Sequence, residues 1–276
     1  MGDWGNKSAL VTGAGTGIGR AISCELARRG ARVYVSALTQ EEAQLVVDEI
    51  VAEGHRASAV ALDVTDDARY REAIEQVARE QGSIDLLVNN AGVIYVGEFH
   101  EMEEFLLKKL IEVNFTAVAI GTLYGYRVMK EQGHGMIANV ASQGGLMPVG
   151  TMAAYSGTKH GVVGLTASVA GEAEAHGVDF RTICPGNVAS EMLNKATTRG
   201  TNAEGVLDTL PKLMSAEDAA VIIVDGLSRK SRKIIFPWYS KLLNVVTRLW
   251  PEFGHKGVVH SIGQFRERRN DQLSQG

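Results

Sequence analysis

The stretch from Ala9 to Gly19 constrains the fold more than any other part of the chain. Apolar residues at 9–11 predict the end of a short buried strand, and glycines at positions 13, 15, 17 and 19 precede a helical run over 20–29. A strand that passes through a glycine-rich turn into a helix leaves backbone N–H groups unpaired beside the positive end of the helix dipole. Because glycine lets the backbone approach a ligand closely, this turn predicts a phosphate site, although a tight connection without a ligand is the alternative.

Strands and helices alternate along the rest of the chain. Further strands are predicted at 31–37, 58–62, 84–88, 136–140, 180–184 and 234–236, and helices at 40–53, 101–132, 155–176 and 216–228, with one more helix that begins after Thr65 and buries Ile74 and Val77. Thr39, Thr65 and Ser215 are expected to cap three of these helices. This alternation indicates βαβ units around a parallel sheet. We therefore expect an α/β fold, a single doubly wound Rossmann-type domain with a seven-stranded, mostly parallel sheet and helices on both faces.

The chain is expected to form a dinucleotide-binding and catalytic domain over 1–232, with a C-terminal extension over 233–276 packed on it. An apolar stripe in the extension predicts a helix that covers the pocket, forms a dimer contact or lies on a membrane surface. Lys241 and Arg248 supply little basic charge for lipid, which favours the first two alternatives. Arg266, Arg268 and Arg269 are expected in a solvated tail. The stripe consists of Leu242, Val245, Val246, Leu249 and Trp250.

Charge and cysteine content limit the partners. The net charge of −4 gives no reason to expect nucleic acid, and the chain has no apolar stretch long enough for stable membrane insertion. The first seven residues do not form a secretory signal. Cys24 and Cys184 are expected as reduced thiols, so we expect a cytoplasmic protein.

Five special residues come directly after predicted strands: Gly13, Asp63, Asn90, Ser142 and Pro185. In a doubly wound sheet, ligands bind beyond the carboxyl ends of the strands. These residues are therefore expected to surround one site.

Tyr155 and Lys159 are four residues apart, so on a helix they share one face. A tyrosine titrates near ~10 unaided and is a poor acid or base at neutral pH. A cation within about 4 to 6 Å could lower that pKa by about 1 to 3 units. Lys159 is placed to do this, although such a pair in isolation is usually an ordinary surface pair.

Together these motifs resemble those of the short-chain dehydrogenase/reductase family, in its compact single-domain branch. The chain carries T-G-x-x-x-G-x-G at 12–19, N-N-A-G at 89–92 and Y-x-x-x-K at 155–159, with Ser142 thirteen residues before the tyrosine and Pro185-Gly186 after the sixth strand. The match runs from about residue 5 to about residue 227.

The resemblance implies four catalytic residues. Tyr155 would be the general acid/base, and Lys159 would lower its pKa and hold the nicotinamide ribose. Ser142 would hydrogen-bond the substrate oxygen, and Asn114 would hold a water that links Lys159 to solvent. The alternatives are a hydroxyl that caps its own loop for Ser142 and a side chain bonded to nearby backbone for Asn114.

The resemblance also implies NAD(P)(H) as cofactor and no metal. Family members that use NAD usually end the second strand with an aspartate, and Ala37 stands there, which favours NADP(H). Leu38 and Thr16 occupy places where NADP-preferring members often have a basic residue. Asp63 would contact adenine, or else cap the helix ahead of Thr65. The implied cofactor contacts are Gly13, Thr16, Gly17, Ile18, Gly19, Ala37, Leu38, Asp63, Val64, Asn90, Ala91, Gly92, Tyr155, Lys159, Pro185, Gly186, Val188 and Ser190.

Apolar residues are expected around the substrate. They suit an apolar alcohol or ketone, although many could instead pack the core. The loop over 187–211 has the composition of a mobile lid. The pocket residues are Ile94, Met147, Val149, Met152, Met192, Leu193, Leu207, Leu210 and Met214, beside Ser142.

Three functions are compatible with the sequence. The first is hydride transfer between NAD(P)(H) and an apolar ketone or secondary alcohol, in a homodimer or homotetramer. The second is reduction of carrier-bound 3-ketoacyl chains, for which Arg127 and Lys130 are the candidates for a basic docking patch. The third is a nucleotide-binding sensor without turnover, which would not need an intact set of catalytic residues.

Overall fold

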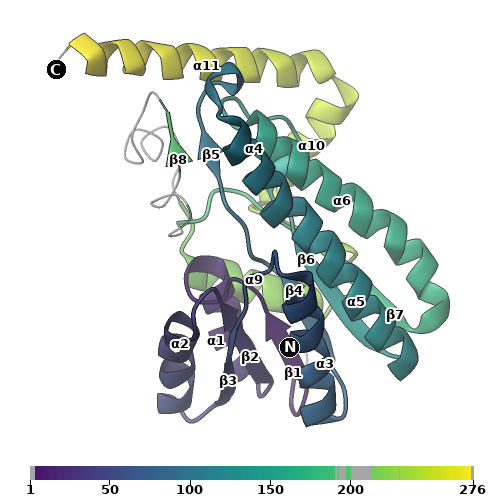
Figure 1. Ribbon diagram of the computed structural model, residues 1–276. Coiled ribbons are helices and arrows are strands. Elements are labelled where there is room, and N and C mark those ends of the chain that lie inside the picture. The colour runs from purple at the N-terminus through teal and green to yellow at the C-terminus, as the bar shows by residue number, and fades with distance from the viewer. Residues whose placement is uncertain (1–3, 190–191, 193–196, 200–212, 230, 275–276) are drawn as a thin grey trace.

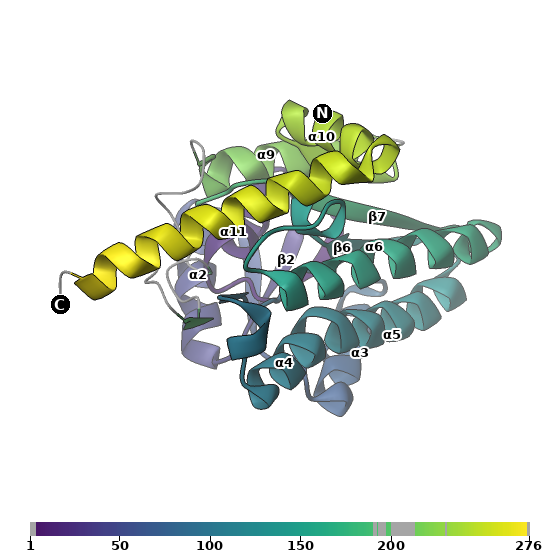
Figure 2. The ribbon, with the colours of Figure 1, turned by 90° about the horizontal axis from the view of Figure 1, so that it is seen from above.

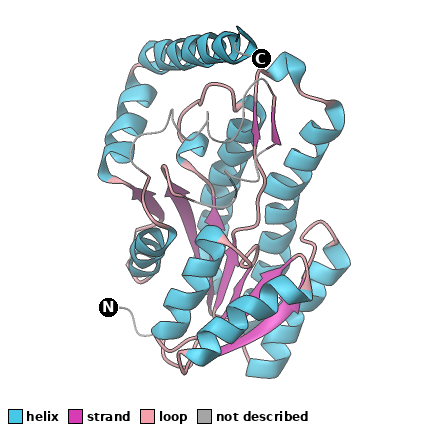
Figure 3. Cartoon of the chain, turned by 90° about the vertical axis from the view of Figure 1, so that its left-hand side faces the viewer, coloured by secondary structure: helices cyan, strands magenta, loops and turns pink. Residues whose placement is uncertain are grey.

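A seven-stranded parallel sheet forms the centre of the computed structural model, which describes residues 4–189, 192, 197–199, 213–229 and 231–274 (Figure 3). All neighbouring strands are parallel, and their order is β3-β2-β1-β4-β6-β7-β9. The expected fold class is confirmed. The strands are β1 (Ser8–Val11), β2 (Arg32–Ala37), β3 (Arg56–Ala61), β4 (Leu86–Asn89), β6 (Gly135–Val140), β7 (Val178–Pro185) and β9 (Lys233–Phe236).

Helices cover both faces of the sheet because successive strand residues point to opposite sides. Val11 and Val35 pack into a core with α1 (Gly17–Arg28), α2 (Gln40–Ala52) and α9 (Ala216–Leu227). Leu10 and Tyr34 face the other way, toward α3 (Asp67–Gln81), α5 (Ala117–Gln132) and α6 (Ala153–Ala173). Strands buried on both faces explain the continuous apolar runs in the sequence.

Two of the three expected helix caps are confirmed. Thr39 accepts a hydrogen bond from the Glu42 backbone N–H at 3.2 Å, and Ser215 caps α9 in the same way. The third expectation was wrong, because Asp66 caps α3. Thr65 instead donates its hydroxyl and its backbone N–H to the Asp63 carboxylate.

The region expected as one helix over 101–132 is divided. It contains the short turn η1 (Phe99–Glu101), α4 (Glu104–Ile111), a π-helical turn η2 (Glu112–Thr116) and α5. A π turn inserts an extra residue into the helix and occurs often at functional sites. Here it carries Asn114, whose side chain is buried.

Two helices follow β9 at the C-terminal end. They are α10 (Trp238–Leu249) and α11 (Pro251–Ser274), and α11 crosses the end of the molecule at which α4 begins (Figures 1 and 2). A two-stranded sheet of β5 (Tyr95–Val96) and β8 (Thr197–Thr198) lies at the same end. The expected extension over 233–276 thus begins with β9, a strand of the main sheet, and the domain division stays a prediction.

The surfaces of α10 and α11 differ from expectation. The apolar stripe of α10 faces outward in the single chain, with Leu249 63% exposed, while Ser240 and Thr247 are buried. Arg266 and Arg269 pair with carboxylates of the segment after β5, as described below, and Arg266 remains 60% exposed as expected while Arg269 is partly buried. Among the helices of the described ranges, none is long and apolar enough to span a bilayer.

The remaining helical turns are η3 (Gln143–Gly145), which follows β6, and η4 (Glu174–His176), which ends α6. Of these, η3 is important for the site because Ser142 is its N-cap residue.

Candidate active site

A cavity of about 1060 Å³ lies at the carboxyl ends of the strands. Residues that follow β1, β3, β4 and β6 line it, as do Ala37 at the end of β2 and Pro185 at the end of β7. Single-ligand sites usually measure about 300–1,000 Å³, so this one has room for more than a small molecule. Every implied cofactor contact within the described residues lines this cavity, and Ser190 lies outside those residues.

The glycine turn packs closely against the segment that follows β4 and presents free N–H groups at the start of α1. Gly13 and Gly17 have φ angles of 60° and 57°, which side-chain-bearing residues rarely adopt. A β-carbon on Gly13 would lie 2.7 Å from the Ala91 Cα, and one on Gly19 would overlap the Asn90 amide. Thr16 precedes α1 without a capping side-chain hydrogen bond, so N–H groups of the first turn remain available for an anion.

Asn90 holds the turn in place. Its side-chain amide donates to the carbonyl oxygens of Thr12 and Gly13, at 2.9 and 3.1 Å. The Thr12 hydroxyl in turn accepts from the backbone N–H groups of Asn90 and Ala91. The N-N-A-G segment and the glycine turn therefore form one rigid unit.

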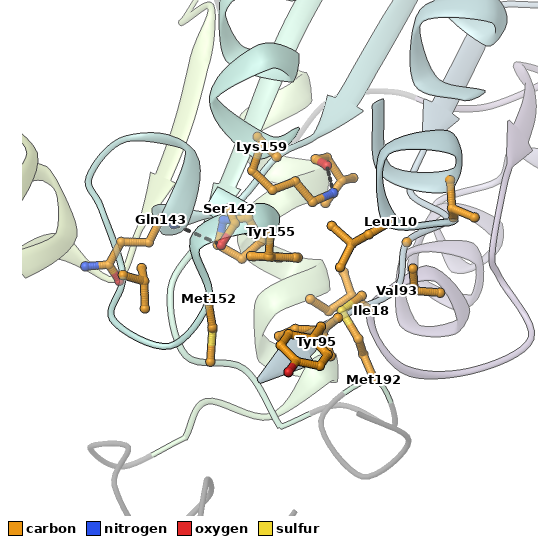
Figure 4. A pocket seen from close by; sticks show the side chains of 18 of the residues that line it. Ile18, Val93, Tyr95, Leu110, Ser142, Gln143, Met152, Tyr155, Lys159 and Met192 are labelled. Atoms are coloured by element: carbon orange, nitrogen blue, oxygen red, sulfur yellow. Dashed lines mark hydrogen bonds between the residues drawn. The ribbon is translucent and has the colours of Figure 1, made fainter. Parts of the chain in front are cut away.

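Ser142, Tyr155 and Lys159 lie together on one side of the cavity (Figure 4). Ser142 begins η3, and its hydroxyl accepts from the Gly144 N–H at 3.1 Å, so it caps its own loop while facing Tyr155. Lys159 Nζ lies 5.8 Å from the centre of the Tyr155 ring and donates to the Val140 carbonyl at 2.9 Å. The expected shared face of α6 is thus observed.

Burial governs the protonation of this group. Desolvation raises the pKa of Tyr155, and its hydrogen bond with Ser142 opposes that rise. Desolvation also lowers the pKa of Lys159, to about 8. The expectation that Lys159 lowers the pKa of Tyr155 was therefore wrong for this structure, because it took account of the nearby ammonium and not of the burial of both groups. At neutral pH the phenol keeps its proton.

Asn114 is fully engaged with the backbone of one neighbour. Its carbonyl oxygen accepts from the Val93 N–H and its amide donates to the Val93 carbonyl, both at 2.8 Å. A β-carbon on Gly92 would lie 3.2 Å from Asn114 Oδ1 and 3.7 Å from Lys159 Nζ, so the three residues are neighbours. The contacts are those of the backbone-bonded alternative, and the role in a proton relay stays a prediction.

Sequence reasoning missed a carboxylate at the β2 end of the cavity. Glu42 lines this end together with Ala37 and Leu38, and its Cβ would lie 3.3 Å from a β-carbon on Gly15. Its position in the first turn after the Thr39 cap was a usable signal, because that turn lies next to the end of β2. Asp63 also lines the cavity while it holds Thr65.

The expected apolar region is present in part. Ile94, Met147, Val149, Met152 and Met192 line the cavity. Met214 does not, because it pairs with the backbone of 187–189 instead. Leu193, Leu207, Leu210 and most of the expected lid fall outside the described residues. Sequence reasoning did not identify Val93, Tyr95, Leu106, Leu110 and Val113, or the lining residues from the last two helices, which are Leu243, Thr247, Phe253, Gly254, Gly257, Val258 and Ser261.

Comparisons with known proteins agree with this geometry. A family model described as short chain dehydrogenase matches residues 7–200. An uncharacterized oxidoreductase, YxjF of Bacillus subtilis, is 34% identical over 82% of this chain and 93% of its own length. Cyclohexanol dehydrogenase of an Acinetobacter species is 36% identical over 68% of this chain and 75% of its own length. The 3-oxoacyl-acyl-carrier-protein reductase FabG of Escherichia coli is 36% identical over 67% and 75% of the two chains.

The solved structures agree as well. A metagenomic short-chain oxidoreductase crystallised with NADP matches with a TM-score of 0.71 and 29% identity, covering 85% of this chain and 98% of its own.

Proposed function

The chain belongs to the short-chain dehydrogenase family, and we propose that it transfers a hydride between NAD(P)(H) and an apolar ketone or secondary alcohol. The observation that carries this proposal is the placement of Ser142, Tyr155 and Lys159 in the same cavity as the glycine turn. A proton and a hydride must move at one carbinol centre, so their donors have to be fixed together.

The described residues fit a dinucleotide. The first turn of α1, which begins at the positive-φ residue Gly17, offers N–H groups to a pyrophosphate, while Gly13 and Gly19 let the turn pack closely against Ala91 and Asn90. Lys159 would hold the nicotinamide ribose, and Asp63 the adenine end. The bound cofactor would supply or accept the hydride.

The choice between the two cofactors depends on one end of the cavity. The missing carboxylate at Ala37 supports the NADP(H) form, as does the relative crystallised with NADP. Glu42 is the opposing observation, because its carboxylate would repel a 2′-phosphate there. We propose that the chain accepts NADP(H), with Glu42 limiting the preference.

The side chains divide the proton chemistry. The Tyr155 phenol, kept protonated by burial, can donate its proton to a carbonyl oxygen that becomes an alkoxide as hydride arrives. Ser142 can donate a second hydrogen bond to the same oxygen, which stabilises the developing charge. Lys159 can stabilise the phenolate that remains, since its ammonium lies on the same side of α6.

Apolar side chains in the cavity support an apolar substrate, as does the resemblance to a cyclohexanol dehydrogenase. The similarity to FabG supports reduction of carrier-bound 3-ketoacyl chains as the second candidate. Arg127 and Lys130, the expected docking residues, lie on α5 and do not line the cavity. The intact set of catalytic residues counts against a sensor without turnover.

The assembly and location are proposals as well. We propose a homodimer or homotetramer in the cytoplasm, and light scattering on the purified chain measures the former.

The test is a cofactor assay at 340 nm. NADPH and NADH are each presented with cyclic ketones, with aliphatic ketones and with a 3-ketoacyl carrier substrate, and the Tyr155→Phe variant is the control. Turnover of ketones that is lost in the variant is expected. Turnover of acyl carriers alone would establish the second candidate, and cofactor binding without any turnover would establish the sensor.

A further inference from the structure

The C-terminal helices form one wall of the cavity. Leu243 and Thr247 of α10 line it, followed by Phe253, Gly254, Gly257, Val258 and Ser261 at the turn into α11 and along α11. From above, α11 crosses over the body of the molecule (Figure 2). The glycine turn at 13–19 connects β1 to α1, and α11 lies at the other end of the molecule from α1 (Figure 1).

The wall is packed tightly against the catalytic loop. The Ser240 hydroxyl donates to Gln143 Oε1 at 3.2 Å, next to Ser142. A β-carbon on Gly150 would overlap the Ser261 hydroxyl, so this glycine allows α11 to approach the loop that leads into α6. The wall therefore has a fixed position relative to Tyr155.

Two ion pairs hold the other end of α11. Arg266 binds both oxygens of Glu98, with N···O distances of 3.0 and 2.5 Å. Arg269 binds Glu101 at 2.8 and 3.0 Å. Glu98 and Glu101 follow β5, and the Gly97 N–H donates to the Thr151 carbonyl at 2.9 Å, so this segment lies beside the loop that contains Gly150. The packing at Gly150 and the two ion pairs thus fasten successive turns of α11 to two adjoining segments.

Gly257 stands out on this wall. It lines the cavity, yet a β-carbon built there meets no other atom within 4 Å. At Gly150 and Gly186, by contrast, a β-carbon would collide with neighbouring side chains. Gly257 is exposed, so its missing side chain leaves open space at the rim of the cavity and is not required by helix packing.

We propose that Gly257 determines the size of the substrate, by leaving room between α11 and the catalytic group for a second apolar unit beyond the reacting ring or chain. The substrate class is then an extended apolar ketone or secondary alcohol, such as a bicyclic one, and not a small one alone. This inference rests on the proposed function. A side chain at this position of α11 would occupy volume that the substrate can fill when the residue is glycine, because a well-packed helix does not move aside.

Gly257→Leu tests the proposal, with Gly263→Leu as the matched control. Both changes replace a glycine of α11 whose β-carbon would be in open space, and both remove the same conformational cost of glycine in a helix, but Gly263 does not line the cavity. A second pair changes the volume in the other direction. Val258→Ala enlarges the cavity, and Val259→Ala is its control on the exposed side of α11.

Steady-state kinetics compare cyclohexanone with 4-cyclohexylcyclohexanone. Gly257→Leu is expected to raise the KM for the bicyclic ketone about tenfold and leave that for cyclohexanone within about twofold, since a few methylene volumes in a pocket discriminate by such factors. Val258→Ala is expected to lower the KM for the bicyclic ketone relative to that for cyclohexanone. Both controls are expected to leave this ratio of KM values unchanged. Equal effects on both ketones, or no effect of Gly257→Leu on the bicyclic one, would overturn the proposal.

A binding measurement separates this proposal from the function on which it rests. The affinity of 1-anilinonaphthalene-8-sulfonate is followed by fluorescence for the same four variants. If the parent chain reduces no ketone, the proposed function fails. Dye binding that is weaker in Gly257→Leu but not in Gly263→Leu would then still support the proposal that residue 257 limits the space for an apolar ligand. Dye affinity that is equal in Gly257→Leu and Gly263→Leu, or no dye binding by the parent chain, would count against it.

Discussion

The ammonium nitrogen of Lys159 lies 5.8 Å from the centre of the Tyr155 ring, one helical turn away on the same face of α6. The lysine also donates to the carbonyl of Val140, the last residue of β6. Ser142 follows that strand by two residues. The end of β6 thus sets the position of the serine and of the lysine, and through the lysine it fixes how α6 presents the tyrosine.

Tyr155→Phe is expected to lower kcat by about 10²- to 10⁴-fold, the usual contribution of a positioned acid or base. The ring that packs beside Met152 stays, so the dissociation constant of the dinucleotide should change little. Turnover and fluorescence titration of NADPH measure the two quantities. Ser142→Ala is the comparison variant, with a smaller loss because it removes one hydrogen bond to the oxygen. Undiminished turnover in Tyr155→Phe would remove this residue from the mechanism.

The burial of Lys159 should appear in the pH dependence of stability. Its folded pKa of about 8 lies below the ordinary lysine value of 10.5, so between these pH values the unfolded chain binds more protons and the free energy of unfolding rises with pH. Lys159→Met should lack this rise. Cys24 and Cys184, whose pKa values are raised by burial to about 11 and about 12, act in the opposite sense in both proteins.

Urea unfolding of both proteins at pH 7 to 10.5 gives the difference between them, in which the Cys24 contribution cancels and the Cys184 contribution cancels only in part, because the Lys159 charge lowers the pKa of Cys184. The expected sign is a parent chain that gains stability relative to the variant as pH rises. A difference that stays constant over this window would show that Lys159 titrates normally in the folded chain.

Local sequence patterns were sufficient for the features that depend on nearby residues. The glycine turn and the Tyr155–Lys159 pair follow from spacing within one turn or one helix, and the strand ends then bring Asp63 and Asn90 to the same edge. The parallel pairing of the strands follows from the alternation of elements, whereas the strand order was not predicted. Such features need only periodicity and the right-handedness of the crossovers.

Contacts between distant segments were not predictable in this way. Arg266 and Glu98 are 168 residues apart in sequence, and nothing local indicates that they meet. The raised pKa of Tyr155 depends on its burial in the folded chain and not on its spacing from Lys159. Thr65 was expected as the cap of α3, but Asp66 offers the same hydrogen-bonding chemistry one residue later and takes that role. The extra residue in the π turn at Asn114 likewise left no signal in the apolar periodicity.

Glu42→Gln is expected to lower the KM for NADPH several-fold and to leave that for NADH nearly unchanged. Removing one charge near a 2′-phosphate at the surface is worth about 1 kcal/mol or less, which limits the effect to about fivefold. Glu41→Gln is the control, because it removes the same charge from the first turn of α2 without lining the cavity. Equal effects of the two variants would mean that only the net charge matters.

Arg266→Ala should release the far end of α11 from the cavity mouth. The hydrogen bonds from Arg266 hold the pKa of Glu98 below its usual value of 4.5, so the ion pair stabilises the closed helix above that pH and the contribution is lost as pH falls through the folded pKa. Hydrogen exchange of the α11 amides is expected to be faster in the variant at pH 6 to 7, with a difference that shrinks below a pH of about 4.

Lys256→Ala removes an exposed cation from the same helix and should leave exchange unchanged. Because the pair is partly exposed, salt should weaken it, and 1 M NaCl should bring the parent chain closer to the variant. Exchange that is identical in the parent and the variant at pH 7 would mean that the Arg269–Glu101 pair and the packing against Gly150 hold α11 in place without Arg266.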